Sequence, residues 1–267
     1  MTTLAAQLNM KERLVMITGG AGHLGYEMAR TVAELGASVV LVDINYDQAM
    51  TRAQAVQTEF GVRCWGMACN LELEEERKHL PARVAEEAGS LDVLINNAGF
   101  VGDSTLKGWV CEFSAQSIET WRRALEVNLT ACFHLSQLFR DQLARNQNGS
   151  IVNVSSIYGV LGPDMSLYDG TAMGNPAAYA ASKGGLVQLT RWLSTVLAPQ
   201  IRVNCISPGG LARGQNPLFS DRYINKTPLK RMGEEQDFKG VTALLASDAS
   251  RWMTGQNLMV DGGWTAW

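Results

Sequence analysis

Near its N-terminus the chain reads Leu14-Val-Met-Ile-Thr-Gly-Gly-Ala-Gly-His-Leu-Gly25, and this segment determines the fold class that we expect. An apolar, strand-like run leads into glycines, and the helical pattern of residues 26–35 follows them. Glycines at this junction permit a tight turn and let the backbone approach a pyrophosphate at the helix N-terminus, where free N–H groups favour anions. The residues that we expect to contact a dinucleotide there are Thr18, Gly19, Gly22, His23, Leu24 and Gly25.

The same alternation of apolar runs and helical patterns continues to the end of the chain. The apolar runs contain many Val and Ile residues and little polar alternation, as expected for a sheet that is covered on both faces. The sequence therefore predicts an α/β fold, a Rossmann-type doubly wound parallel sheet flanked by helices. The predicted strands are 14–18, 38–42, 63–67, 91–95, 151–155 and 201–206, and the predicted helices include 26–35, 72–88, 118–145 and 178–197. Because no linker or repeat divides the chain, residues 1–267 are expected to form a single domain.

Composition and charge argue against several other classes of protein. Hydrophobic residues make up 46% of the chain and charged residues 18%, as in an ordinary globular protein. The net charge is −3 and no basic run stands out, which argues against a nucleic-acid partner. The five cysteines contain no Cys-x-x-Cys pair, so we expect reduced thiols, no metal site and a cytoplasmic location. No signal peptide or membrane-spanning stretch is apparent, so no membrane partner is expected.

The end of the second predicted strand indicates which dinucleotide is expected. Asp43 stands there, and a carboxylate at this place accepts hydrogen bonds from the adenosine ribose and repels a 2′-phosphate. Neither positions 44 and 45 nor the glycine turn carries an Arg or Lys that would attract a phosphate. NAD is therefore expected rather than NADP. Asp43 would also serve as a cap for the helix that begins near Asp47, and the two roles are compatible.

Two further motifs follow in order. Asn96-Asn-Ala-Gly99 comes directly after the fourth predicted strand, where small residues let a cofactor lie close to the backbone, although such clusters also mark ordinary turns. From it we take Asn97, Ala98 and Gly99 as cofactor contacts. Tyr179-Ala-Ala-Ser-Lys183 places a phenol and an ammonium on one face of a helix. A free phenol has a pKa of about 10, and an adjacent ammonium stabilises its phenolate and so lowers that pKa toward the range of acid–base catalysis.

Together these motifs resemble the short branch of the short-chain dehydrogenase/reductase family. The resemblance also rests on Glu126-Val-Asn-Leu129, Val154-Ser-Ser156, Ser207-Pro-Gly209 and Val260-Asp-Gly-Gly263, and so it covers nearly the whole chain. It implies that Tyr179 gives or takes a proton while Lys183 tunes it and binds the nicotinamide ribose. It also implies that Ser156 orients the substrate oxygen and that Asn128 holds a water. From the residues alone, Ser156 could instead be a strand-end hydroxyl and Asn128 a buried residue at a helix kink.

The resemblance implies further cofactor contacts, some with departures from the family pattern. Asn70 replaces the usual Asp after the third strand, and its carbonyl can still accept from the adenine amine; Leu71 follows it. The usual Thr after Ser-Pro-Gly is missing, and backbone groups of Gly210 and Leu211 are expected to replace it. The contacts implied in this last segment are Pro208, Gly209, Gly210 and Leu211.

Other departures concern the glycine turn and two loops. His23 occupies a usual glycine position, and the resulting spacing resembles the longer, sugar-nucleotide-modifying branch, for which this chain is too short. The interval from Ser156 to Tyr179 is longer than usual because of an insertion at 162–174, whose Asp164, Tyr168 and Asp169 are either substrate or subunit contacts or part of a mobile surface loop. A lid is expected at about 211–231, and its basic residues either bind an anion or form a solvated face. They are Arg213, Arg222, Lys226, Lys230 and Arg231.

The resemblance implies an NAD-dependent oxidoreductase that interconverts a secondary alcohol and a ketone on a small polar, sugar-like or sugar-phosphate substrate. Two alternatives stay open: a hydride-cycling sugar epimerase or dehydratase, suggested by the glycine spacing, and a non-catalytic NAD(H)-sensing module. Two stretches near residues 209–215 and 252–258 resemble enzymes of bacterial surface-sugar and flagellin-sugar pathways. The resemblance also implies a homotetramer or homodimer, with Trp252, Trp264 and Trp267 buried at an interface.

Overall fold

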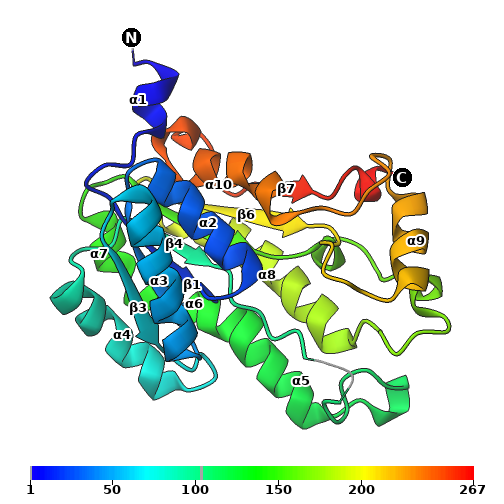
Figure 1. Ribbon diagram of the computed structural model, residues 1–267. Helices are drawn as coiled ribbons and strands as arrows, with labels where there is room; N and C mark the ends of the chain where they lie inside the picture. The colour runs from blue at the N-terminus through cyan, green and yellow to red at the C-terminus, as the bar shows by residue number, and fades with distance from the viewer. Residues whose placement is uncertain (1, 103–104) are drawn as a thin grey trace.

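Seven strands form one parallel sheet at the centre of the computed structural model, which describes residues 2–102 and 105–267. The strands are β1 (Leu14–Thr18), β2 (Ser38–Asp43), β3 (Cys64–Ala68), β4 (Val93–Asn96), β5 (Gly149–Val154), β6 (Ile201–Pro208) and β7 (Asn257–Val260). Their order across the sheet is β3-β2-β1-β4-β5-β6-β7. Figure 1 labels β1, β3, β4, β6 and β7. The predicted Rossmann-type α/β fold is therefore confirmed.

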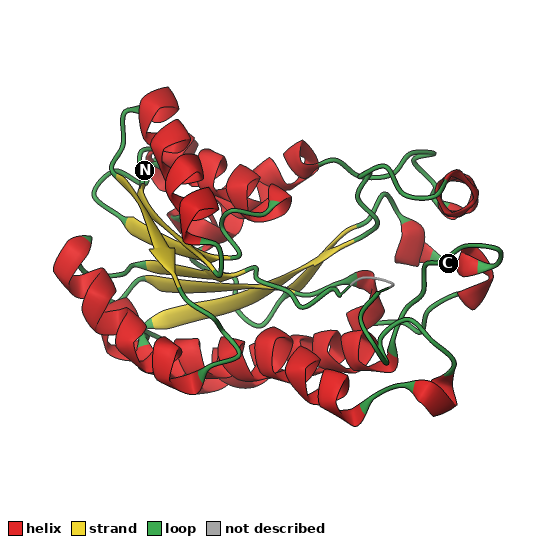
Figure 2. Cartoon of the chain, turned by 60° about the horizontal axis from the view of Figure 1, so that its bottom comes forward, coloured by secondary structure: helices red, strands yellow, loops and turns green. Residues whose placement is uncertain are grey.

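Helices cover both faces of this sheet (Figure 2). The α-helices in the described residues are α1 (Leu4–Leu8), α2 (His23–Glu34), α3 (Tyr46–Phe60), α4 (Glu74–Glu87), α5 (Ile118–Leu125), α6 (Ala131–Leu138), α7 (Arg140–Ala144), α8 (Ala177–Val196), α9 (Pro217–Lys226) and α10 (Lys239–Ala246). Of these, α1 and α9 lie away from the sheet (Figure 1). Side chains of β1 alternate between two hydrophobic cores: Val15 and Ile17 pack with Val32 of α2, whereas Met16 packs with Leu135 of α6. Because both faces are buried, the strands read as continuous apolar runs.

Two differences from the predicted elements have local physical reasons. The helix expected over 118–145 is interrupted, since a π-helical turn at Glu126–Thr130 separates α5 from α6, and a further break at Phe139 separates α6 from α7. The apolar spacing continues across these breaks, so the pattern did not reveal them. The edge strand β7 was not among the predicted strands, because it is short and only half-buried.

The arrangement of β1 fixes where a ligand would bind. This strand pairs with β2 on one side and with β4 on the other, so the order of the strands reverses there. In open parallel sheets, ligands bind outside the carboxyl ends of the strands at such a reversal. The glycine turn follows β1 and Asn97 follows β4, which places both motifs at this point.

Among the described residues, no helix combines the length and the apolar character that crossing a membrane requires.

Candidate active site

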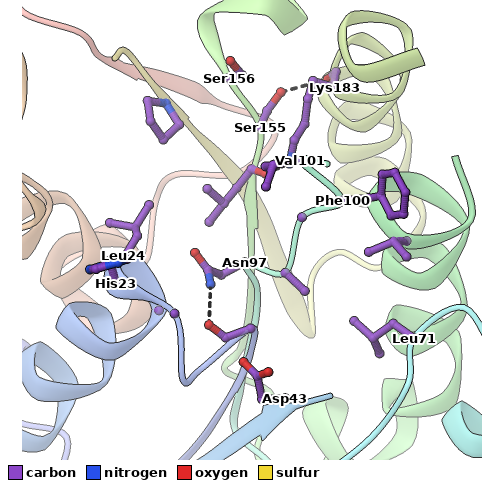
Figure 3. Close-up of a pocket in the computed structure, with 18 of the residues that line it drawn as sticks. His23, Leu24, Asp43, Leu71, Asn97, Phe100, Val101, Ser155, Ser156 and Lys183 are labelled. Carbon is purple, nitrogen blue, oxygen red and sulfur yellow. Dashed lines mark hydrogen bonds between the residues drawn. The ribbon is translucent and has the colours of Figure 1, made fainter. Parts of the chain in front are cut away.

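A cleft of about 600 Å³ lies at the carboxyl ends of the central strands. In Figure 3, Ser156 and Lys183 lie at one end of it, Asp43 and Leu71 lie at the other, and Asn97 lies between them. The predicted site residues that line the cleft are Gly19, Gly22, His23, Leu24, Gly25, Asp43, Asn70, Leu71, Asn97, Ala98, Gly99, Ser156, Tyr179, Lys183, Pro208, Gly209 and Leu211. Thr18, Asn128 and Gly210 are not among its lining residues.

The glycine turn is held by the loop that follows β4. The Asn97 amide donates to the carbonyls of Thr18 (3.0 Å) and Gly19 (3.1 Å), and the Thr18 hydroxyl accepts from the backbone N–H groups of Asn97 and Ala98 (3.1 Å each). A Cβ at Gly25 would lie 2.3 Å from the Gly19 carbonyl oxygen and 2.6 Å from the Asn97 amide nitrogen. Only glycine fits there, because the first turn of α2 packs directly against the turn. Thr18 therefore joins the two loops from behind the cleft.

Asp43 is anchored to the glycine turn. Its carboxylate accepts from the backbone N–H groups of Ala21 (3.1 Å) and Asn45 (3.2 Å). The cap of α3, which the sequence allowed for Asp43, is formed by Asn45, whose side chain accepts from the Gln48 N–H. The Asp43 carboxylate is thus fixed at the rim of the cleft at the end of β2.

A buried arginine, which was not predicted from the sequence, organises the loop after β3. Arg77 is 2% exposed, and its guanidinium donates to the Leu71 carbonyl and to Nδ1 of His134 (3.1 Å) and pairs with Glu126 (2.6 Å). It joins a lining residue of the cleft to the π-helical turn. Burial, and then the positive charge of Arg77, lower the pKa of His134, so the imidazole remains a neutral acceptor.

At the other end of the cleft, α8 supplies both members of the Tyr-x-x-x-Lys pair. The Lys183 side chain is buried, its ammonium donates to the Val154 carbonyl (2.8 Å), and it lies 5.8 Å from the centroid of the Tyr179 ring. The Ser155 hydroxyl donates to the Lys183 carbonyl (2.8 Å). These two bonds fix α8 against the end of β5, so Tyr179 and Lys183 enter the cleft from one face of the helix.

Ser156 follows β5, which ends at Val154, and caps the short turn Ile157–Gly159. Its hydroxyl accepts from the Tyr158 N–H (3.2 Å), which is the structural role of a strand-end hydroxyl, and Ser156 also lines the cleft beside Tyr179. The hydroxyl retains its own proton as a donor. The two readings of Ser156 from the sequence are therefore compatible.

Asn128 lies in the π-helical turn and is completely buried. Its side-chain oxygen accepts from the Phe100 N–H (2.6 Å), and its amide donates to the Ser182 hydroxyl (3.0 Å). It thereby joins the loop after β4 to α8, two segments that both line the cleft. Isolated π-helical turns are often found at functional sites.

The basic residues of the lid have intramolecular partners. Arg213 pairs with Glu235 (3.1 Å) and Arg231 with Asp237 (2.6 Å), while Lys226 pairs with Asp164 and lowers the pKa of that carboxyl to about 2. Arg222 and Lys230 donate to backbone carbonyls. Of these basic residues, Arg213 lines the cleft, as does the neighbouring Gln215.

Several lining residues were not assigned from the sequence as contacts. Among them are Val42, Ile44, Cys69, Glu72, Phe100, Val101, Val127, Val154 and Ser155. Most of them are direct neighbours of the motifs. Extending each motif by two residues would have found them, because a strand end exposes consecutive residues to a ligand. No group of three or more His, Cys, Asp or Glu side chains among residues 2–102 and 105–267 is placed to hold a metal ion.

Comparison with known proteins adds to this geometry. A family model described as enoyl-(acyl carrier protein) reductase matches residues 19–265. The chain is 32% identical over 258 residues to 3-oxoacyl-[acyl-carrier-protein] reductase FabG of Staphylococcus epidermidis, with 93% of this chain and 97% of that protein covered. NAD⁺-bound xylitol dehydrogenase has a TM-score of 0.83 at 29% identity, covering 95% of this chain and 99% of that chain. A gluconate 5-dehydrogenase from Burkholderia cenocepacia, in complex with NADP and tartrate, has a TM-score of 0.87 at 26% identity, covering 99% and 100%.

Proposed function

This chain belongs to the short-chain dehydrogenase/reductase family, and we propose that it is an NAD-dependent oxidoreductase that interconverts a secondary alcohol and a ketone on a small polar substrate. Family membership makes it an NAD(P)-dependent oxidoreductase of alcohols and ketones; the choice of NAD and the polar substrate are the finer proposal. One observation carries it: Tyr179, Lys183 and Ser156 line the same cleft as the glycine turn and Asp43. We propose that residues 1–267 act as one dinucleotide-binding and catalytic domain.

The residues of the cleft fit a dinucleotide. The first-turn N–H groups of α2 follow Gly22, which caps that helix, and they suit a pyrophosphate. Asp43 at one end and Lys183 at the other suit the two riboses, and the Asn70 oxygen, which accepts from the Glu72 N–H (3.0 Å), has a second lone pair for the adenine amine. A bound nicotinamide would supply the hydride.

The protein's part in the reaction is to move a proton and orient the substrate. Tyr179 exchanges a proton with the substrate oxygen, and Ser156 donates a hydrogen bond to the same oxygen as negative charge develops on it. Lys183 uses one N–H on the Val154 carbonyl, which leaves donors for the ribose. Asn128 acts through the positions of Phe100 and Ser182. The water predicted at Asn128 would complete a proton path from Lys183.

The preference for NAD rests on Asp43. Its carboxylate is held in place by two backbone N–H groups, so it cannot easily turn away from a 2′-phosphate. The described cations that line the cleft are Lys183, at the opposite end, and Arg213, which is paired with Glu235. The two solved relatives contain NAD in one case and NADP in the other, so the family relationship leaves this choice to local residues.

A polar substrate is favoured by the lid side of the cleft. Gln215 accepts from the Arg213 N–H (2.8 Å), and both residues line the cleft, to which they add an amide and a guanidinium. A hydroxylated substrate with a carboxylate or phosphate could draw Arg213 away from Glu235. The resemblance to surface-sugar and flagellin-sugar enzymes stays a prediction.

We expect Tyr179→Phe to lower turnover at least about a hundredfold while NADH still binds, because the ring remains and only the proton-exchanging hydroxyl is lost. Wild type and variant are compared for NADH formation from NAD with polyols, sugars, sugar phosphates and sugar nucleotides, and NADH affinity is measured by fluorescence. Tyr168→Phe is the matched control, because Tyr168 lacks a lysine four residues on. Full activity of Tyr179→Phe would overturn the assignment. Substrate conversion without NADH accumulation would indicate the epimerase or dehydratase, and NADH binding without any turnover would indicate the sensor.

A further inference from the structure

The insertion at 162–174 packs against the lid helix α9. The Lys226 ammonium pairs with the Asp164 carboxylate, and the Arg222 guanidinium donates to the carbonyls of Asp169 (2.5 Å) and Leu167 (3.3 Å). These contacts bind the insertion to two successive turns of α9. The insertion therefore holds α9 in place. From the sequence, the insertion and the lid were predicted only as two separate loops beside the site.

Aromatic rings on the buried side of α9 add to these contacts between the insertion and the helix. The Tyr168 ring of the insertion lies 5.4 Å from Phe219, Phe219 lies 5.8 Å from Tyr223, and Tyr223 stacks on Trp264 with centroids 5.5 Å apart and planes inclined by 20°. The Tyr168 and Tyr158 hydroxyls share a hydrogen bond (2.8 Å). Trp264, which the sequence placed at an interface between subunits, is thus buried in its own chain. The Tyr223 ring is fixed on both sides.

Tyr223 in turn supports the loop after β6. The Gly210 N–H donates to the Tyr223 hydroxyl oxygen (2.7 Å). A Cβ at Gly209 would lie 2.9 Å from that oxygen, and a Cβ at Gly210 would lie 2.9 Å from the ring. The loop therefore rests directly on the phenol, and its residues Pro208, Gly209 and Leu211 line the cleft.

We propose that Tyr223 is a positioning residue for the cofactor: its hydroxyl holds the Gly210 N–H and thereby fixes the loop on which one side of the dinucleotide lies. The inference rests on the proposed function. Tyr223 is 2% exposed and is not among the residues that line the cleft, so it acts through the loop. Backbone groups of Gly210 and Leu211 were expected to contact the cofactor; the Gly210 N–H instead fixes the shape of the loop, and Leu211 lines the cleft.

Tyr223→Phe tests this role, because it removes the hydroxyl and keeps the ring in the aromatic cluster. Loss of one net hydrogen bond of about 1 kcal/mol corresponds to roughly a fivefold change in affinity, and we expect the Kd for NADH to rise by about that factor. Tyr168→Phe is the matched control, since it removes a buried hydroxyl from the same cluster without touching Gly210. NADH fluorescence titration gives both Kd values, and thermal unfolding shows whether the two variants lose similar stability.

Hydrogen exchange gives a second readout that needs neither NADH nor activity. In the peptide that contains Gly210, about one backbone amide should exchange its hydrogen faster in Tyr223→Phe than in the wild type. In Tyr168→Phe the exchange of this peptide should match that of the wild type. A wild-type Kd in Tyr223→Phe, or an equal rise in both variants, would overturn the inference. A wild-type chain that binds no NADH would overturn the proposed function, and the inference with it.

Discussion

Asp43 at the end of β2 shows that a motif predicts where a functional group lies but not which groups hold it there. The sequence placed a carboxylate at Asp43 for the ribose, and the structure puts that carboxylate at the rim of the cleft. Its two backbone donors, Ala21 and Asn45, could not be predicted, because they depend on how the glycine turn folds back on β2. The same limit applies to Thr18 and Gly210, since a sequence does not tell which side of the backbone a group faces.

We expect Asp43→Asn to reduce the preference for NADH over NADPH by about tenfold, or about 1.4 kcal/mol, because the negative charge is removed. The asparagine oxygen can still accept one of the two backbone N–H groups that Asp43 binds, whereas its amide nitrogen cannot accept the other. The measurement is the ratio of the two Kd values. Asp47→Asn is the control, because Asp47 is an exposed residue of α3 that does not line the cleft. An unchanged ratio in Asp43→Asn would show that selectivity arises elsewhere.

Among the elements, the π-helical turn at Glu126–Thr130 is the feature that periodicity could not show. A π turn contains an extra residue, and the apolar spacing on both sides remains helical, so residues 118–145 read as one helix. The turn buries Asn128, and Arg77 of α4 holds it by pairing with Glu126 at its first residue. The sequence shows that residue 77 is an arginine but not that it is buried, because its partners Leu71, Glu126 and His134 come from three separate segments.

The contact between Arg77 and His134 predicts a pH dependence of stability. Folding lowers the pKa of His134 below its unfolded value of about 6.5, so the unfolded chain takes up the proton more readily. The stabilisation by neutral His134 is therefore fully present at pH values above the unfolded pKa. It is lost as the pH falls from the unfolded pKa to the lower folded pKa. We expect His134→Gln, which keeps an acceptor for Arg77, to lose less stability than wild type between pH 7.5 and pH 5.5.

Urea unfolding at the two pH values measures this difference. His79→Gln is the control, because His79 lies exposed on α4. If His134→Gln and wild type lose the same stability on acidification, His134 is not the group responsible.

For the whole molecule, the sequence was sufficient to predict the alternation of strands and helices and the Rossmann-type fold, but not the less regular parts. Continuous Val- and Ile-rich runs marked β1, β2 and β4–β6 well because both faces of these strands are buried. The strand β7 is four residues long and half-buried, so it gave too short a pattern. The packing of the insertion on α9 depends on contacts between distant residues, such as Asp164 with Lys226, and no local pattern encodes it.

Two tryptophans on the outside of the chain favour self-association. Trp252 is 98% exposed and Trp267 is 79% exposed, although such large apolar side chains are usually covered. We expect a homotetramer or homodimer at micromolar concentration, and light scattering coupled to gel filtration should give a multiple of 29.1 kDa. Trp252→Ser should lower the average mass on dilution. A mass of one chain for the wild type at micromolar concentration would contradict the prediction.

The strand order described above also bears on how the chain can assemble as it is synthesised. After β1, the strands β2 and β3 each add at the same edge, and β4, β5, β6 and β7 then add one after another at the opposite edge. Every strand therefore pairs with one that has already been made. In a ribosome-bound chain, which emerges N-terminus first, the second edge of β1 stays open while β2 and β3 are made, until β4 pairs with it. Only the step from β3 to β4 moves to the opposite edge of the sheet, and this step brings the loops after β1 and β4 together. The nascent chain therefore forms its cleft at the one step where the direction of strand addition reverses.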